Sequence, residues 1–210
     1  MKEQTYTQFI QQLIDGFQPG EPILVRELGN RIAEAYAMEE KKACAAAAVA
    51  VKRLIDTGTC PNLRFFAKGV YYVTKQTVFG ETGINKDKLI ELKYLKDGTG
   101  YETGAAVMHK LGLTTLMPAE RTFVSNSAQH RAKRDDALGI VIRAPRIPVN
   151  KENRFYLQFL DLLNMYDDVP VDAEDPYQLL GRFVQARGLD YGTLLHLADT
   201  HYNGNTIMKL

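Results

Sequence analysis

The sequence has little of what marks exported, membrane-spanning or metal-binding proteins. Its 210 residues include two cysteines, Cys44 and Cys60, which form no metal-ligand spacing with the four histidines and no disulfide framework. No run approaches the roughly 18 uncharged apolar residues that a membrane-spanning helix needs. Residues 1–12 alternate polar and apolar side chains and lack the apolar centre of a signal peptide. We therefore expect a cytoplasmic protein with no membrane association and no bound metal.

Net charge of either sign is also nearly absent, because 26 lysines and arginines stand against 25 acidic residues. Phosphate binding depends on a surplus of cations, so the neutral total by itself argues against a nucleic-acid partner. The charges are unevenly distributed, however. Residues 41–80 hold seven basic side chains and one acidic side chain, whereas residues 1–40 and 151–210 each carry a net charge of −4. The basic block permits local binding to nucleic acid, although a solvated surface can reach the same charge by chance.

The first 80 residues have a pattern of helices followed by a hairpin. Apolar residues at helical spacing predict a first helix that starts near Thr5 or Thr7, and Gly58 stands where a glycine cap of the third helix is expected. We expect helices at about 5–17, 28–36 and 39–57, an apolar run at 23–25, and strands at 63–67 and 70–73 around the turn Lys68-Gly69. This order is typical of a winged helix-turn-helix, a DNA-reading layout.

The third expected helix supplies the candidate DNA-binding surface. If its apolar stripe faces the core, the buried residues are Cys44, Ala47, Ala48, Val51, Leu54 and Ile55. The opposite stripe and the cations of the hairpin then form the expected DNA-binding set: Lys41, Lys42, Ala45, Ala46, Val49, Lys52, Arg53, Arg64 and Lys68. Small side chains would let this helix lie close in the major groove, with lysines on phosphates or guanine edges and methyl groups on thymine methyls. The alternative is that the alanine run packs in a core and the cations are only solvated.

The rest of the chain predicts a second, mixed α/β domain. We therefore expect an α+β fold with two domains. Residues 1–78 are expected to form the winged helix-turn-helix domain, and residues 79–210 are expected to form the second domain. Its expected elements are a helix at 89–95, strands at 121–125 and 138–143, and a helical end at about 154–203 with helices at 154–166, 176–187 and 191–202. The acidic loop 167–175 is expected to be solvated.

The glycine-rich segment Gly98-Thr99-Gly100-Tyr101-Glu102-Thr103-Gly104 has two interpretations. Glycines that open a helix can hold a phosphate on backbone amides, but no P-loop lysine follows at the required spacing. We favour a turn, then a helix capped by Thr103 and stopped at Gly112, then a strand.

A second group of cations lies at Arg131, Lys133 and Arg134. It is either a second basic patch for DNA or an acidic partner, or a solvated helix beside Asp135 and Asp136.

Several segments together resemble a known family. They are Gly69-Val70-Tyr71-Tyr72, Phe79-Gly80, Gly100-Tyr101-Glu102-Thr103-Gly104, Leu111-Gly112-Leu113-Thr114-Thr115, Pro118 and Val124-Ser125-Asn126. Over about residues 8–160 the chain resembles the AbiEi-like antitoxins and related winged-helix regulators of abortive-infection systems. The resemblance implies an N-terminal winged helix that binds double-stranded DNA in its own promoter and represses it. It also implies a C-terminal domain that neutralises a nucleotidyltransferase-like toxin.

Catalytic groups show no convergent pattern. The histidines His109, His130, His196 and His201 are scattered, and the last two point to different faces of a helix. Asp97, Glu102 and Glu120 could form a metal-dependent nuclease site, because such sites hold metal ions on carboxylates. Their spacing in the sequence, however, does not distinguish such a site from a chance arrangement. We expect a non-enzyme without a cofactor. The alternative from another class is a protein-interaction module that binds a toxin or a second copy of the chain.

Overall fold

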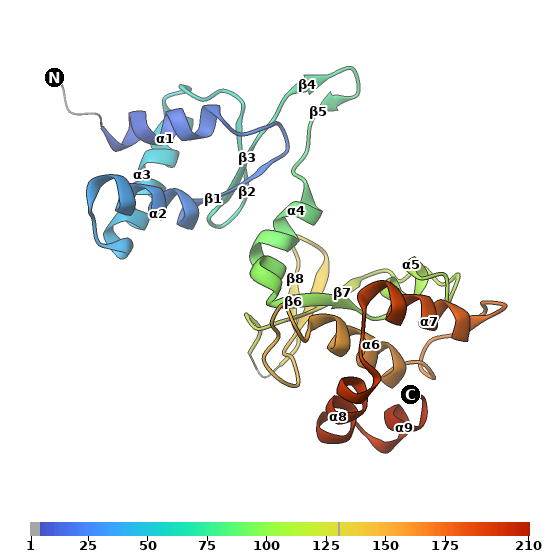
Figure 1. The fold of residues 1–210 in the computed structure, drawn as a ribbon. Helices are drawn as coiled ribbons and strands as arrows, with labels where there is room; N and C mark the ends of the chain where they lie inside the picture. The colour runs from blue at the N-terminus through green and yellow to red at the C-terminus, as the bar shows by residue number, and fades with distance from the viewer. Residues whose placement is uncertain (1–4, 130) are drawn as a thin grey trace. The chain divides into compact units, whose positions relative to one another are not determined.

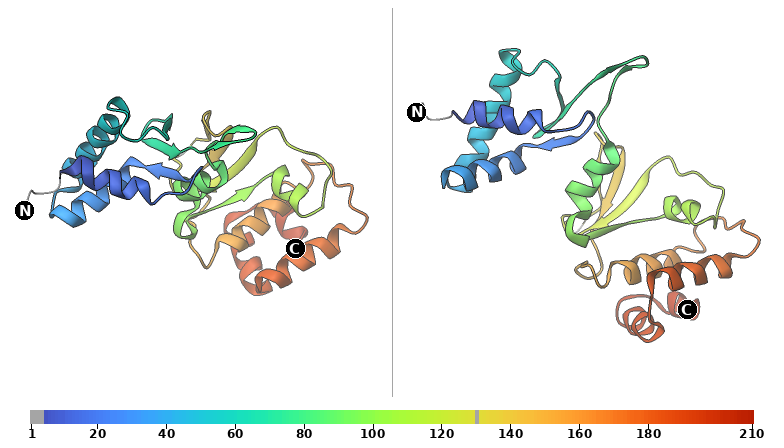
Figure 2. Two further views of the ribbon diagram at one scale, coloured as in Figure 1. Left: turned by 90° about the horizontal axis from the view of Figure 1, so that it is seen from above. Right: turned by 45° about the horizontal axis from the view of Figure 1, so that its top comes forward.

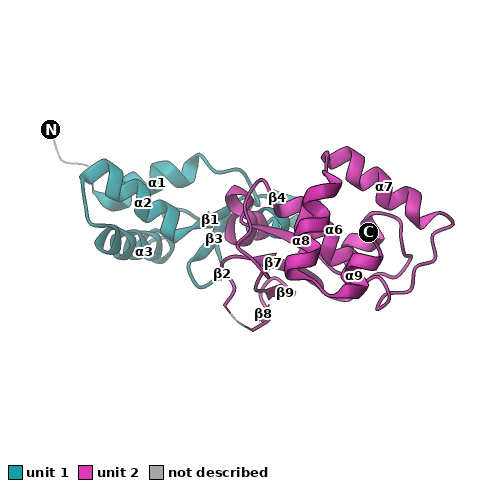
Figure 3. Ribbon diagram, turned by 60° about the horizontal axis from the view of Figure 1, so that its bottom comes forward, with its two compact units in different colours: residues 1–89 teal, residues 90–210 magenta. Residues whose placement is uncertain are grey.

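The computed structural model describes residues 5–129 and 131–210 and has an α+β fold (Figure 1). The chain divides into two compact units, residues 1–89 and residues 90–210, which Figure 3 colours separately. Over the described residues, no helix combines the length and the apolar character needed to cross a membrane.

Unit 1 packs helices α1, α2 and α3 around an apolar core beside an antiparallel sheet (Figure 1). Its elements are α1 (Tyr6–Asp15), β1 (Pro22–Leu24), α2 (Val25–Tyr36), α3 (Glu40–Asp56), β2 (Leu63–Ala67), β3 (Val70–Val73), β4 (Gln76–Thr77) and β5 (Gly80–Glu81). The sheet has the order β1-β3-β2, and Tyr71 in the central strand pairs with Ile23 on one side and Phe65 on the other. The expected helices and strands of residues 5–73 are thus confirmed.

Local signals set the ends of the helices in unit 1. The Thr5 hydroxyl accepts a hydrogen bond from the Gln8 backbone N–H, and the Gln8 side chain accepts one from the Thr5 N–H, which makes a capping box at the start of α1. Helix α2 ends at Ala37, whose left-handed backbone (φ 49°) turns the chain toward α3. Gly58 after α3 also has a positive φ of 66°, as expected of a residue that ends a helix.

The second unit begins later than the sequence indicated. The Asn85 N–H donates to the Gly20 carbonyl at 2.7 Å, and Lys88 pairs with Glu21 at 2.6 Å. These bonds attach the segment after residue 78 to unit 1, so the boundary expected after residue 78 falls inside the β4–β5 hairpin. Gly80 lies at the turn of this hairpin, as the first residue of β5, where its φ of 106° favours glycine.

Unit 2 combines a mixed sheet with helices: the C-terminal helices gather on one side of the sheet (Figure 2), and the helical segment before the first strand of the unit packs against the sheet separately. After α4 (Lys86–Ile90), where the unit boundary falls, come η1 (Glu91–Leu95, a π-helix), η2 (Lys96–Gly98), β6 (Gly100–Thr103), α5 (Ala105–Lys110), β7 (Arg121–Ser125), β8 (Lys133–Asp135), β9 (Ile140–Arg143), α6 (Arg154–Asn164), α7 (Pro176–Arg187), α8 (Tyr191–His201) and α9 (Gly204–Met208). The strand order is β6-β7-β9-β8, with β7 and β9 parallel. Helix α6 packs against β6 and α8, and its buried leucines join the core with residues of α5, α7 and α8.

The glycine-rich segment corrects the expectation made for it. Residues 100–103 form strand β6 instead of a turn, and Thr103 is buried in the sheet and does not cap α5. Gly100 is needed there because an added Cβ would lie 2.5 Å from the Tyr94 carbonyl oxygen and 2.6 Å from that of Val124. Close backbone approach, which glycine alone allows, thus explains a glycine inside a strand.

The segment after Gly112 is also different from the expectation, because residues 113–118 form no strand. Its polar groups bond to the acidic loop: the Thr115 N–H and hydroxyl donate to the Asp172 carboxylate, and the Asp172 N–H donates to the Leu113 carbonyl. These hydrogen bonds lower the pKa of Asp172. The loop 167–175 is therefore attached at this point to its own domain, although we expected it to be solvated throughout.

Candidate nucleic-acid interface

Helix α3 is held on its inner side by close packing against α2. The buried residues of α3 are Ala43, Ala47, Ala50, Val51 and Leu54. Gly29 of α2 faces Cys44, and a Cβ added to Gly29 would lie 2.6 Å from the Cys44 Sγ and 2.8 Å from its Cα. Small side chains on both helices therefore fix a close crossing of α2 and α3, which in turn fixes which residues of α3 remain outside.

The outer face of α3 consists of the exposed residues Lys41, Lys42, Ala45, Ala48, Val49, Lys52, Arg53 and Asp56, and Glu40 and Ile55 are exposed at its margins. Two residues expected in the core, Ala48 and Ile55, are exposed, and Ala46, expected outside, is partly buried and packs against the core. Because the middle of α3 is almost all alanine, the sequence does not show which side of the helix faces the core. The expected buried and exposed faces are therefore rotated about the helix axis relative to the observed ones. The four expected cations of α3, Lys41, Lys42, Lys52 and Arg53, are all exposed.

Weak ion pairs surround this face. Lys42 lies 3.6 Å from Glu39, and Arg26 of α2 lies 3.5 Å from Glu40, with all four side chains mostly exposed. Exposed pairs of this kind contribute roughly 0–1 kcal/mol, so a phosphate can replace the carboxylate at little cost. Because Glu39 and Glu40 stand at the start of α3, its middle and last turns, where Lys52 and Arg53 outnumber Asp56, are the more cationic part of the face.

The hairpin between β2 and β3 gives different places to its two expected DNA contacts. Lys68 is exposed in the turn beside Gly69. Arg64 instead donates to both oxygens of the Glu81 carboxylate, at 3.2 and 2.6 Å, and to the Pro61 carbonyl at 2.6 Å. Its guanidinium is therefore engaged within unit 1 and must exchange this carboxylate for a phosphate to contact DNA. Glu81 comes from β5, so this pairing depends on a hairpin that the sequence did not predict.

The β4–β5 hairpin carries an apolar tip that sequence reasoning missed. Val78 and Phe79 are 94% and 98% exposed. The turn is ordered by the Thr77 hydroxyl, which donates to the Gly80 carbonyl at 2.7 Å and accepts from the Phe79 N–H at 3.2 Å. Two large apolar residues immediately before a glycine, in an otherwise polar segment, are the signal that would have identified it.

The second group of cations does not form a single patch. Lys133 and Arg134 lie in strand β8, not in a helix, so they face opposite sides. Arg131 and Lys133 line a cavity of about 620 Å³ together with Lys93. Arg134 pairs with Glu120 at 2.6 Å and Asp136 at 3.0 Å. The neighbouring His130 lies outside the described residues.

A polar cluster lies beside this cavity. The Asp135 carboxylate accepts hydrogen bonds from the Lys93 ammonium and the Tyr94 hydroxyl, each at 2.6 Å. Burial raises the pKa of Asp135, but these two hydrogen bonds outweigh it, and the net pKa is lowered. The cluster attaches the π-helix η1 to the edge strand β8.

Two of the three carboxylates considered for catalysis, Glu102 and Glu120, have separate partners. Glu102 pairs with Lys110 and Arg121, and Glu120 pairs with Arg134. Over the residues that the structure describes, no group of three or more histidine, cysteine or acidic side chains is placed to hold a metal ion.

Comparison with models of protein families and with curated proteins found no match to this chain.

Proposed function

We propose that unit 1 is a winged helix-turn-helix domain that binds double-stranded DNA through the outer face of α3, and that the protein is an antitoxin-like repressor of its own promoter. The observation that carries the proposal is the composition of this face: small side chains lie between cations on an exposed helix. The element order α1-β1-α2-α3-β2-β3 supports it, because a winged domain has this order with its third helix in the major groove.

In this proposal the small residues set the depth of binding. Ala45 and Ala48 let the backbone of α3 approach the base edges, and Val49, which is 51% exposed, offers its methyl groups to thymine. Lys42 and Arg53, at opposite ends of the face, reach phosphates or guanine edges. Lys68 in the β2–β3 turn contacts the adjacent backbone. The acidic remainder of the chain limits affinity for random DNA, because binding is confined to one local face.

The first experiment measures binding of the purified chain to DNA from its own upstream region, at several salt concentrations. We expect specific binding that weakens steeply with salt, and a slope of log affinity against log salt that decreases by about 1 for each phosphate that a variant no longer neutralises. Lys42→Ala and Arg53→Ala should weaken binding, while Arg182→Ala, which removes an exposed arginine from α7, is the matched control. Equal affinities of all three variants and the wild type would refute the assignment of α3.

A second variant separates groove binding from simple charge. Ala45→Gln adds a neutral, helix-favouring side chain to an exposed position, so folding stability should stay nearly unchanged. If α3 lies deep in the groove, the added atoms collide with base edges and binding falls by about tenfold or more, a change of roughly 1.4 kcal/mol. Unchanged binding would mean that the cations act without close approach of the helix.

The antitoxin part of the proposal is supported by the family resemblance of the segments around Gly100-Tyr101-Glu102-Thr103-Gly104. It requires a toxin partner, of the nucleotidyltransferase-like class. Co-expression with the product of the adjacent reading frame should restore growth if that product is toxic alone. A neighbour that is harmless on its own, or toxic and not neutralised, would leave only the DNA-binding part.

The apolar tip of the β4–β5 hairpin favours a second candidate function, a protein-interaction module. An aromatic side chain that is almost wholly exposed and held on an ordered turn has the character of an interface anchor. Phe79→Ser should abolish co-purification with the neighbouring gene product or self-association, without changing DNA binding. If wild type shifts no DNA and the variant loses its partner, this function replaces the first.

A further inference from the structure

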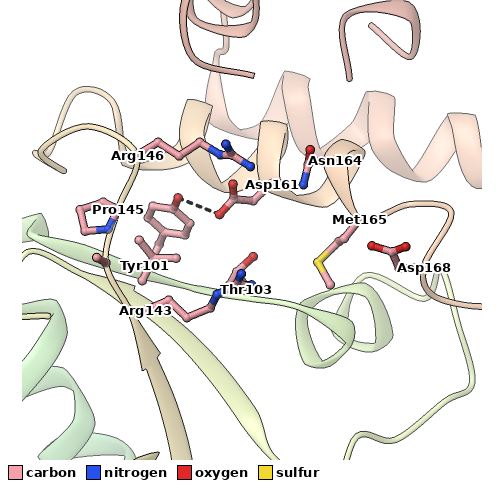
Figure 4. Close-up of a pocket in the computed structure, with 11 residues that line it drawn as sticks. Tyr101, Thr103, Arg143, Pro145, Arg146, Asp161, Asn164, Met165 and Asp168 are labelled. Carbon is pink, nitrogen blue, oxygen red and sulfur yellow. Dashed lines mark hydrogen bonds between the residues drawn. The ribbon is translucent and has the colours of Figure 1, made fainter. Parts of the chain in front are cut away.

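Unit 2 contains a polar cavity that the proposed DNA-binding function does not use. Its volume is about 380 Å³, within the range of small-molecule pockets. Tyr101 and Thr103 of β6 line it, since alternate residues of a strand share one face. Arg143 and Arg146 come from the end of β9 and the loop beyond it, and Asp161 comes from α6, which covers this face of the sheet (Figure 4).

The Asp161 carboxylate is a fixed acceptor in this cavity. The Tyr101 hydroxyl donates to one of its oxygens and the Tyr202 hydroxyl to the other, each at 2.9 Å. Burial raises the pKa of both tyrosines, which therefore remain protonated donors. Burial also raises the pKa of Asp161 on balance, and the tyrosine hydrogen bonds and the two arginine charges, which favour the carboxylate, offset part of this increase. Each carboxylate oxygen still has a lone pair for a further donor.

Two guanidinium groups face this carboxylate without pairing with it. Arg146 stacks on the Tyr202 ring, 4.5 Å from its centroid, and reaches the His201 carbonyl at 3.5 Å. Arg143 is exposed at the end of β9. Neither arginine forms an ion pair with a carboxylate over residues 5–129 and 131–210. The cavity therefore presents cations with free hydrogen-bond donors and an oriented acceptor. In Figure 4, Arg146 lies beside Asp161, Arg143 lies near Thr103, and the carboxylate of Asp168 lies farther along the wall.

We propose that this cavity binds a small molecule with a carboxylate or phosphate group, held by Arg143 and Arg146, and an adjacent hydrogen-bond donor that is directed to Asp161. Planar guanidinium groups bind both oxyanions through paired hydrogen bonds. Asn164 and Thr103 add polar groups at the wall, and Met165 and Val124 add apolar surface for the body of the ligand. The proposal concerns unit 2 alone and does not depend on DNA binding.

The distinctive glycine-rich segment gains a physical explanation from this site. Gly100 permits the close approach that β6 makes to neighbouring backbone. That approach places the Tyr101 ring under Asp161 and Thr103 at the cavity wall, while Glu102, on the opposite face of the strand, pairs with Lys110 and Arg121. A motif without a role in the DNA-binding proposal is thus the floor of this cavity.

The test uses the full chain and calorimetric titration with three probes: inorganic phosphate, L-aspartate and adenosine 5′-monophosphate. Charge-assisted hydrogen bonds from two guanidinium groups lead us to expect affinity of about 1 mM for phosphate and tighter binding of a probe that also has a donor. L-aspartate and adenosine monophosphate distinguish a carboxylate ligand from a phosphate ligand.

Variants identify the groups that bind. Arg143→Gln, at an exposed position, should weaken every probe about tenfold or more, and Arg182→Gln on α7 is the matched control with unchanged affinity. Asp161→Asn should weaken L-aspartate and adenosine monophosphate, because their donors lose the carboxylate acceptor. Failure of all three probes to bind wild type at about 10 mM, or equal binding by Arg143→Gln, would overturn the proposal.

Discussion

The substitution Gly29→Ala, which adds one methyl group to α2, tests whether α2 and α3 cross as closely as the structure shows. Gly29 lies inside α2, where alanine is ordinarily preferred by about 1 kcal/mol because glycine costs more backbone entropy on folding. At this position the added Cβ would meet the Cys44 Sγ at 2.6 Å and the Cys44 Cα at 2.8 Å. The thiol can rotate, but the Cα belongs to the backbone of α3, so the methyl group fits only if the two helices move apart.

The magnitude follows from these two opposing effects. Overpacking of a close-packed core costs about 1–3 kcal/mol, and this contact, which includes backbone, belongs at the upper end. After the gain of about 1 kcal/mol in helix propensity, Gly29→Ala should lower the free energy of unfolding of unit 1 by about 2 kcal/mol. If DNA binding requires the outer face of α3 in its present orientation, the affinity should fall as well.

Gly181 supplies the matched control. It also lies within a helix, α7, but nothing lies within 4 Å of the position of its added Cβ. Gly181→Ala should therefore stabilise unit 2 by about 0.5–1 kcal/mol. Urea unfolding, with hydrogen exchange of the α2–α3 and α7 peptides to separate the two units, measures both variants. A stabilised or unchanged Gly29→Ala variant would refute the close crossing.

Two predictions concern unit 2. Asp135→Asn should destabilise it by about 1–2 kcal/mol at pH 7, because Lys93 and Tyr94 lose a partly buried ionic acceptor. The pKa of Asp135 is lowered in the folded state, so its contribution to folding stability is fully present above the unfolded pKa of about 3.9 and is lost as the pH falls below that value. The urea midpoints of the variant and the wild type should therefore converge at about pH 3. A difference between the two midpoints that does not change with pH would contradict this. Gly100→Ala should cost about 3 kcal/mol or more in urea unfolding, because carbonyl oxygens of Tyr94 and Val124 occupy the space; a small loss would show that β6 can move.

The sequence predicted elements whose signals are local. Apolar spacing, caps and turn residues located α1, α2, α3, α6, α7 and α8 to within a few residues, because a helix is specified by residues three and four apart. Strand β6 was missed because its start is a glycine, and glycine indicates a turn unless the chain is known to pass another backbone closely. That information lies in the backbone of Tyr94 in the preceding π-helix and of Val124 in β7, whose positions depend on the fold of unit 2.

Burial was harder to predict than helix position. In α3 the side that faces the core is chosen by Gly29 on α2 and not by any difference among the alanines. Arg64 was expected to contact DNA because its charge can be read directly from the sequence. Its pairing with Glu81 could not be, because Glu81 lies on a later hairpin that the sequence did not indicate. The cavity in unit 2 had no sequence signal as a site, since Tyr101, Arg143 and Asp161 meet only through the order of strands β6-β7-β9 and the packing of α6.

The alanines of α3 separate a structural explanation from a functional one. Ala43, Ala47 and Ala50 are buried, and the close crossing with α2 requires small residues on that side. Ala45 and Ala48 are exposed, so core packing places no limit on their size. High helix propensity explains an alanine there, but lysine, glutamine and glutamate have nearly the same propensity and are commoner on a solvated face. A surface that must lie against another molecule favours alanine over these longer residues. The outer alanines, more than the cations beside them, are therefore the residues that distinguish a binding face from an ordinary charged helix.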